Sequence, residues 1–153
     1  MTGTFPIVHD VVIQPDGRII AVGDFDGYNG YATHDIVRIN PDGSPDMTFL
    51  PGTDIGFQSV ALAPEGKLIV SGFLPEYQGS STGRLFRLNS DGSIDATFQA
   101  FPGADAVAYG IAVQPDGSVI AAGAITSTVS VALESTFDSA LALPASSRTT
   151  MAK

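Results

Sequence analysis

The sequence of 153 residues predicts an all-β fold made of repeated units. Similar segments recur at residues 11–23, 60–72 and 111–123. Each segment places a Pro-Asp-Gly or Pro-Glu-Gly turn between two short apolar runs, which is typical of a β-hairpin. No stretch is a convincing helix, since residues 130–143, although rich in Ala and Leu, also contain Val and Thr and match the end of the repeat.

The hairpin of the first repeat is expected to join strands at residues 11–13 and 18–22. Proline presets φ for the first central position of the turn, Asp bonds to nearby backbone, and Gly adopts a positive φ. The runs are apolar on both faces, so we expect both faces of each sheet to be covered. The equivalent strand pairs are residues 59–63 with 67–72 and residues 110–114 with 118–123.

A second element follows the first two hairpins. Residues 38–49 match residues 87–98 at an offset of 49, which also relates the first two hairpins. This match predicts a third strand at residues 35–40 and its copy at residues 84–89.

The end of each complete repeat contains further recurring residues. A fourth short strand is expected to follow an Asp-Gly turn and to end at Phe49 or Phe98. Arg38 and Arg87 recur on the third strand, where a repeated Asp is the expected partner.

The chain therefore holds about two and a half repeats, at about residues 5–49, 50–98 and 99–137. In the third copy, residues 133–137 resemble the end of the earlier repeats but follow the hairpin too soon. We expect a repeat domain over residues 1–140 and an irregular tail or arm over residues 141–153.

Repeats of this length with three to four strands each are typical of β-propeller blades. A β-sandwich is the alternative, because it also has short strands at regular spacing. A propeller closes with about 4–8 blades. We therefore expect the chain to complete its packing with copies of itself, for example as about three chains of two blades or two chains of three.

The repeated pattern also resembles a known family, the delta-60 repeat. Its residues are Val-x-x-Gln-Pro-Asp-Gly-[Lys/Arg]-Ile, then Gly-x-Phe-x-x-Tyr-x-Gly, then Arg-[Ile/Leu]-Asn-x-Asp-Gly-Ser-x-Asp-x-Thr-Phe. The second copy departs from the pattern at Ala63 and Leu74. The resemblance covers about residues 5–123 and implies a propeller-like fold with binding roles on a cell surface or a virion. It implies no catalytic residues.

Composition excludes several classes of function. The net charge of −9 argues against a nucleic-acid partner, because such binding needs clustered Lys and Arg, and against anionic membrane surfaces. The absence of cysteine excludes disulfides, a Cys-bound zinc site and a thiol nucleophile. No apolar run approaches the ~20 residues of a transmembrane helix, so membrane insertion is not expected. The start of the chain lacks the pattern of a signal peptide, and the localisation stays open, with a virion or the extracellular space favoured.

Candidate sites are few. Asp24, Asp26 and Asn29 lie in a Gly-rich loop and are weak candidates for calcium, since the spacing of a calcium loop fails at Tyr28. We expect no other metal and no cofactor. No pair of carboxylates stands out as an acid and a nucleophile, so no catalytic residue is assigned.

Recurring aromatic residues are the candidates for an interaction surface. Tyr28 and Tyr77 share one repeat position, and Phe25 and Phe73 lie near an equivalent position. Packing between blades is one interpretation of these residues, and a surface for a partner or a carbohydrate is the other.

The expected function is a non-enzymatic structural or interaction module that assembles with itself, such as a phage tail, fibre or capsid-decorating protein. The expected partners are copies of the chain and other virion or surface proteins. A secreted or cell-surface module that binds glycans or proteins is the alternative, and a propeller glycoside hydrolase is the third hypothesis.

Overall fold

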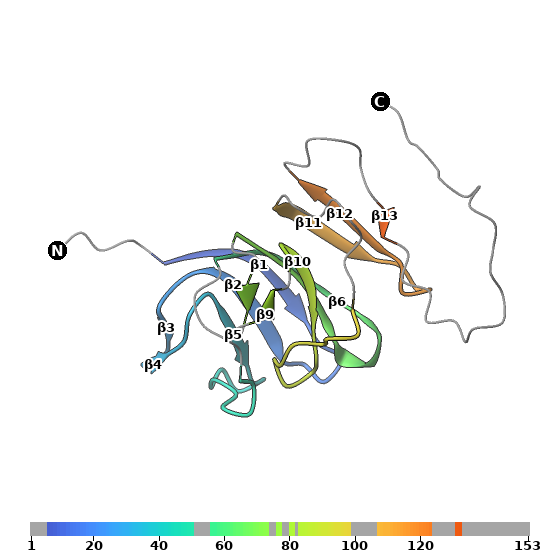
Figure 1. Ribbon diagram of the computed structural model, residues 1–153. Helices are drawn as coiled ribbons and strands as arrows, with labels where there is room; N and C mark the ends of the chain where they lie inside the picture. Colours follow the sequence, from blue (N-terminus) through green and yellow to red (C-terminus); the bar gives the residue numbers. More distant parts are fainter. Residues whose placement is uncertain are drawn as a thin grey trace, which may run out of the picture.

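The computed structural model describes residues 6–50, 56–73, 76–77, 80–81, 83–98, 107–123 and 131–132. Three antiparallel sheets of three strands follow one another along the chain, and we call them blades 1, 2 and 3 (Figure 1). The all-β prediction is confirmed. Blade 1 contains β1 (Ile7–Ile13), β2 (Ile19–Asp24) and β5 (Ile36–Ile39); blade 2 contains β6 (Phe57–Leu62), β7 (Leu68–Gly72) and β10 (Leu85–Leu88); blade 3 contains β11 (Ala108–Val113), β12 (Val119–Gly123) and β13 (Val131–Ala132).

Shorter elements complete the blades. A two-stranded hairpin lies between the second and third strands of blades 1 and 2. A 3₁₀ turn, η1 (Pro64–Gly66), joins β6 to β7. No helix in the described part of the chain is long and apolar enough to cross a membrane. The two hairpins are β3 (Gly27–Tyr28) with β4 (Tyr31–Ala32) and β8 (Glu76–Tyr77) with β9 (Ser80–Ser81).

The turn of the first hairpin has the predicted chemistry. Gly17 has φ of 83°, and the Asp16 carboxylate accepts a hydrogen bond of 3.0 Å from the Arg18 backbone N–H. In the second repeat Glu65 takes a left-handed φ of 62°, a conformation that costs an L-residue free energy. The second turn therefore closes the same hairpin through a less favourable backbone.

Sterics explain why a glycine stands at position 23, near the end of β2. The register of β1 and β2 shifts between Val8 and Asp10, which is a β-bulge. Next to this bulge, a Cβ on Gly23 would lie 2.0 Å from the Ile7 carbonyl oxygen. Equivalent shifts occur in blade 2 between Phe57 and Ser59 and in blade 3 between Ala108 and Gly110.

The predicted fourth strand is reduced to a single bridge. Ile39 bridges to Pro45, and Leu88 bridges to Ile94 in the second repeat. The short fourth strand expected to end at Phe49 is limited to this bridge in the first repeat, because the Asp46 carboxylate accepts the Thr48 backbone N–H at 2.9 Å and turns the chain. The end of the third repeat, residues 133–137, and the tail at residues 141–153 lie outside the described residues.

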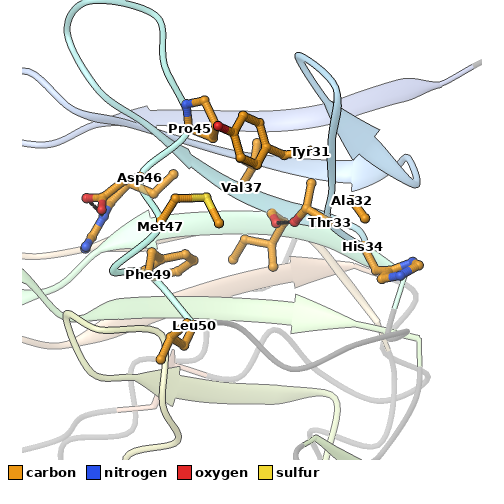
Figure 2. Close-up of a pocket in the computed structure, with 12 residues that line it drawn as sticks. Tyr31, Ala32, Thr33, His34, Val37, Pro45, Asp46, Met47, Phe49 and Leu50 are labelled. Carbon is orange, nitrogen blue, oxygen red and sulfur yellow. Dashed lines mark hydrogen bonds and ion pairs between the residues drawn. The ribbon is translucent and has the colours of Figure 1, made fainter.

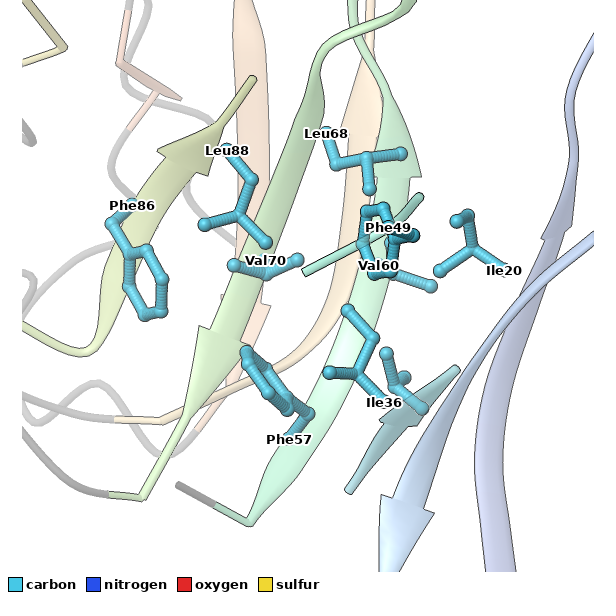
Figure 3. Packing of buried hydrophobic residues seen from close by; sticks show 10 residues of the cluster. Ile20, Ile36, Phe49, Phe57, Val60, Leu68, Val70, Phe86 and Leu88 are labelled. Atoms are coloured by element: carbon cyan, nitrogen blue, oxygen red, sulfur yellow. The ribbon is translucent and has the colours of Figure 1, made fainter. Parts of the chain in front are cut away.

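The blades stack face to face. One core cluster lies between blades 1 and 2 and contains Ile20, Phe57 and Leu68 (Figure 3). A second cluster lies between blades 2 and 3 and contains Ile69, Leu85 and Val119. Both faces of blade 2 are therefore covered, as the apolar runs predict. The first strands of consecutive blades also contact each other, β1 with β6 and β6 with β11.

Candidate interaction surfaces

A buried ion pair ties blade 1 together. Arg38 on β5 and Asp46 after the bridge are each 6% exposed, and the Arg38 Nε lies 2.9 Å from the Asp46 Oδ2. Arg18, at the start of the hairpin's second strand, lies 3.4 Å from the same oxygen. The other carboxylate oxygen accepts from the Thr48 backbone N–H and hydroxyl at 2.9 and 2.7 Å. Every acceptor site of this buried carboxylate is thus matched by a donor from its own repeat.

These donors set the charge state of the carboxylate. Burial acts to raise the pKa of Asp46, because it disfavours the charged form. The hydrogen bonds from Thr48 and the charge of Arg38 outweigh burial and hold the pKa below its ordinary value. Asp46 is therefore ionised at neutral pH and engaged in structure.

The second repeat builds the same arrangement. Arg87 Nε and Lys67 Nζ lie 2.8 and 2.7 Å from the Asp95 Oδ2, and the Thr97 hydroxyl donates to its Oδ1. Burial again acts to raise the pKa of Asp95, and hydrogen bonds from Lys67, Thr97 and Arg87 lower it far below its ordinary value. Arg87 also lies over the Phe98 ring, as Arg38 lies over the Phe49 ring. The predicted partnership of the repeated Arg with a repeated Asp is confirmed.

Polar contacts cross the seam between blades 1 and 2. We use seam for the contact surface between consecutive blades. The Arg38 guanidinium donates to the Ser90 carbonyl oxygen of blade 2. The Leu50 N–H donates to the Asp91 carbonyl oxygen at 2.8 Å, and the Gly56 N–H donates to the Asp35 carboxylate at 2.9 Å. These bonds fix the angle at which one blade meets the next.

A second set of contacts joins the first strands. The Asp10 Oδ2 accepts from the Ser59 hydroxyl at 2.8 Å and from the Val60 N–H at 3.0 Å. The His9 Nδ1 lies 2.9 Å from the Phe57 carbonyl oxygen. His9 and Asp10 align with polar residues of the second repeat at an offset of 49, but no motif in the sequence marks them as seam residues.

Each blade has two faces with different neighbours. We call the face toward the preceding blade the front face and the face toward the following blade the back face. The front face of blade 2 is buried against blade 1. Its residues are Phe57, Val60, Leu62, Leu68, Val70, Phe86 and Leu88.

The front face of blade 1 carries apolar residues at the same repeat positions but lacks a neighbouring blade in the described chain. Val8 is 57% exposed where Phe57 is 0% exposed, and Val11 is 52% exposed where Val60 is 2% exposed. The part nearer β5 is covered by Phe25 and Tyr28 of the same blade. The residues of the front face of blade 1 are Val8, Val11, Ile13, Ile19, Ala21, Val37 and Ile39.

Among the described residues, the back face of blade 3 is the other end of the stack without a neighbouring blade. Ala112 and Ala122 are exposed and Ile120 is half-buried, whereas Ala61 and Ile69 at equivalent positions of blade 2 are buried. The described part of the chain therefore ends on both sides in a β-sheet face of apolar residues.

The predicted aromatic candidates occupy different environments. Phe25 is buried against Ala21 and Val37, and the hydroxyl of the partly buried Tyr28 donates to the Gly43 carbonyl oxygen at 3.0 Å. Phe73 is exposed and its N–H donates to the Gly56 carbonyl oxygen at 3.2 Å. Tyr77 lies in β8, and its side chain lies outside the described part of the structure.

The weak calcium candidates face different neighbours. The Asp24 Oδ2 lies 3.4 Å from the His9 Nε2, and the Asp26 Oδ1 lies 3.8 Å from the His34 Nδ1. Asn29 has φ of 48° and forms the turn between β3 and β4. Among the residues that the structure describes, no three His, Asp or Glu side chains form a group that could hold a metal ion.

A groove of about 250 Å³ lies beside β5 and the turn that follows it (Figure 2). Phe49 is a buried part of its lining, while Tyr31, Met47 and Leu50 are exposed along it. The second repeat has small or polar residues at the positions of these three exposed residues. The large apolar side chains at this groove are therefore not required by the repeat itself. The second-repeat residues are Ser80, Ala96 and Gln99.

Comparison with known protein families supports a β-propeller fold. A family described as "Domain of unknown function (DUF5122) beta-propeller" matches residues 14–49 and 63–98, which contain the Arg-Asp-Thr-Phe arrangements of blades 1 and 2. No curated protein sequence matches the chain.

Solved structures of virginiamycin B lyase from Staphylococcus aureus are similar to the chain. The selenomethionine-substituted enzyme is 18% identical, with 76% of this chain and 34% of that chain covered and a TM-score of 0.46. A catalytically inactive variant with quinupristin is 17% identical, with 80% and 36% covered and a TM-score of 0.48. The chain thus spans about a third of the length of these structures. The family match and the stacked antiparallel blades together show that the chain has a β-propeller-like fold.

Proposed function

We propose that this protein is a non-enzymatic structural and interaction module, built of delta-60-type repeats, that assembles with copies of itself. The observation that carries the proposal is the β1 part of the front face of blade 1, which is exposed and has no neighbouring blade in the described chain. Its apolar residues stand at positions that are buried in blade 2, so the repeat supplies a surface made for a neighbouring blade.

A comparison of the free energy of burial with the cost of association indicates that the seam involves more of the face than a few side chains. Full burial of one Val or Ile side chain stabilises by about 1.5–3 kcal/mol. Association costs about 4–15 kcal/mol of translational and rotational freedom. Val8, Val11 and Ile13 alone therefore barely offset this cost, and a stable assembly needs the rest of the seam as well.

The proposed setting is a virion, as part of a phage tail, a fibre or a capsid-decorating layer. The likeness of the repeats to the delta-60 pattern supports this setting, and repeated self-association is what such structures require. The partners are copies of the chain and neighbouring virion or surface proteins.

The proposal is tested by measuring the mass of the purified full chain in solution. Multi-angle light scattering across a range of concentrations should give a mass well above 15.8 kDa, and electron microscopy should show rings or fibres. A monomer at every concentration, with a cooperative thermal transition, would contradict self-assembly.

A second candidate function is a binding module for a protein or a glycan. The groove beside β5 favours it, because Tyr31, Met47 and Leu50 expose apolar surface that the repeat does not require. Exposed aromatic and Met side chains are enriched in protein interfaces. Binding to peptide and glycan arrays should be lost in Tyr31→Ala and kept in Val11→Ala, which lies on another surface.

The groove supports glycoside hydrolysis less than it supports binding. That reaction uses a pair of carboxyl groups about 5–10 Å apart. Asp46 contributes a carboxylate to the lining, but this carboxylate is bound by Arg38 at 2.9 Å.

A further inference from the structure

We infer that the copies join head to tail, with the back face of blade 3 of one copy against the front face of blade 1 of the next. This inference rests on the proposed self-assembly and specifies which surfaces meet. The two faces stand at the ends of the described stack, and at both seams inside the chain a front face packs against the back face of another blade.

The seams inside the chain show what such a contact looks like. The front face of blade 2 receives Ile20, Val22 and Ile36 of blade 1. The front face of blade 3 receives Ile69 and Leu85 of blade 2. Moving this relationship forward by one repeat places the back face of blade 3 on Val8, Val11 and Ile13 of a second copy. The residues of that back face are Ala112, Ile120 and Ala122.

The sizes of the side chains fit this pairing. Ala112 and Ala122 are small and exposed, and they flank the half-buried Ile120. The opposing face presents the larger Val11 and Ile13, which are also exposed. Val11 and Ile13 of one copy can therefore pack against Ala112 and Ala122 of the other, since close packing places large side chains against small ones.

Tyr109 supplies an anchor for the contact. It is 58% exposed, and it occupies the bulge position that His9 occupies in blade 1. In the seam between blades 1 and 2, the His9 Nδ1 lies 2.9 Å from the Phe57 carbonyl oxygen. Val8 is the equivalent of Phe57, so the exposed ring of Tyr109 is placed beside Val8 of the second copy. Tyr is enriched among the residues that dominate binding energy at interfaces.

The polar groups at the ends also match. In the first seam, the Val60 N–H requires the Asp10 carboxylate of the preceding blade. Blade 3 has Gly110 at the position of Asp10 and so offers no carboxylate to the next copy. The Val11 N–H, which is the equivalent of Val60 N–H, is already bonded to its own Asp10 Oδ1 at 2.8 Å. Blade 3 therefore lacks a carboxylate for the next copy, but the Val11 N–H of that copy already has an acceptor in its own Asp10.

A head-to-tail contact uses two different surfaces on each copy, which produces a closed ring or an open filament. A two-fold contact would instead use one surface twice. Variants that block one surface at a time separate these arrangements.

The experiment uses three full-length variants, with mass measured by sedimentation velocity. Val11→Arg blocks the front face of blade 1, and Ala112→Arg blocks the back face of blade 3. Ala96→Arg is the control, because this exposed alanine lies on neither face and outside the groove. Circular dichroism melts confirm that each variant is folded. We expect each blocked variant alone to be a monomer, and the control to assemble like the unmodified chain.

The mixture of the two blocked variants gives the decisive result. Val11→Arg retains a back face and Ala112→Arg retains a front face, so an equimolar mixture should form a dimer and nothing larger. If Ala112→Arg alone stays dimeric while Val11→Arg dissociates, the contact is two-fold and the inference is wrong. If both stay fully assembled, the seam lies elsewhere and the inference is also wrong, although self-assembly stands. If the unmodified chain is itself a monomer, the proposed function fails along with the inference.

Discussion

Val11 and Val60 occupy the same position in the first strands of consecutive blades, yet Val11 is 52% exposed and Val60 is 2% exposed. Both residues are valines, and each lies at the same position of the first strand of its blade, paired with the equivalent residue of the second strand. The difference is that Val60 has blade 1 in front of it. The difference in exposure between Val11 and Val60 therefore shows how much burial a neighbouring blade provides at this position.

Replacing each of these valines by alanine should separate stability from assembly. Val60→Ala leaves a cavity between blades 1 and 2 and should lower the free energy of unfolding by about 2 kcal/mol. Val11→Ala removes surface methyl groups and should change the unfolding of the single chain by less than about 0.5 kcal/mol. Urea denaturation of both variants at low protein concentration, where assembly does not contribute, gives the comparison. Equal losses would show that the two positions are equally packed in the single chain.

Asp46→Ala should destabilise blade 1 strongly, because it leaves the Arg38 guanidinium buried without its carboxylate. Removing one partner of a buried ion pair costs about 3–5 kcal/mol. Asp42→Ala is the matched control, since Asp42 also caps a turn but is exposed and pairs with no cation in the described structure. Thermal unfolding should show a large fall in Tm for Asp46→Ala and a small one for Asp42→Ala. Similar falls would contradict a special role for the buried pair.

Stability should decrease in acid. Asp46 and Asp95 have a folded-state pKa below the ordinary value, and in the unfolded chain their pKa returns to about 3.9. The unfolded state therefore binds more protons below this pH, so the stabilisation is complete above about pH 4 and is lost as the pH falls toward the folded-state values. Urea midpoints measured between pH 6 and pH 2.5 should show this decrease, and Asp95→Asn should reduce its slope. A midpoint independent of pH in this range would rule out the linkage.

Gly23→Ala should disrupt the first hairpin. A Cβ at Gly23 would lie 2.0 Å from the Ile7 carbonyl oxygen, and backbone atoms of β1 would have to move. We expect a loss of several kcal/mol, at the upper end of single-residue effects. Gly110→Ala is the control because open space surrounds the position of its Cβ. Hydrogen exchange of the β1 and β2 amides should accelerate in the first variant alone.

Much of the blade could be predicted from the sequence because its determinants are local. The offset of 49 located the hairpins, and the Pro-Asp-Gly turn formed with the expected φ at Gly17. The recurrence of Arg38 predicted a repeated Asp as its partner, and the structure shows that this partner is Asp46. The pattern predicted a short fourth strand but could not show its length, because the Asp46 side chain turns the chain after one bridge.

The repeat pattern by itself determined the architecture of each blade, since strands, turns and the buried ion pair depend on residues within one repeat. Tertiary structure decided which of two equivalent residues is buried. Val11 and Val60 are the same residue type at the same repeat position. Only Val60 is buried, because another sheet lies against it. Likewise His9 and Asp10 became seam residues only when stacking brought β6 beside β1. The hydrophobic effect acts on the area removed from water, and that area is a property of the assembled blades and not of one strand.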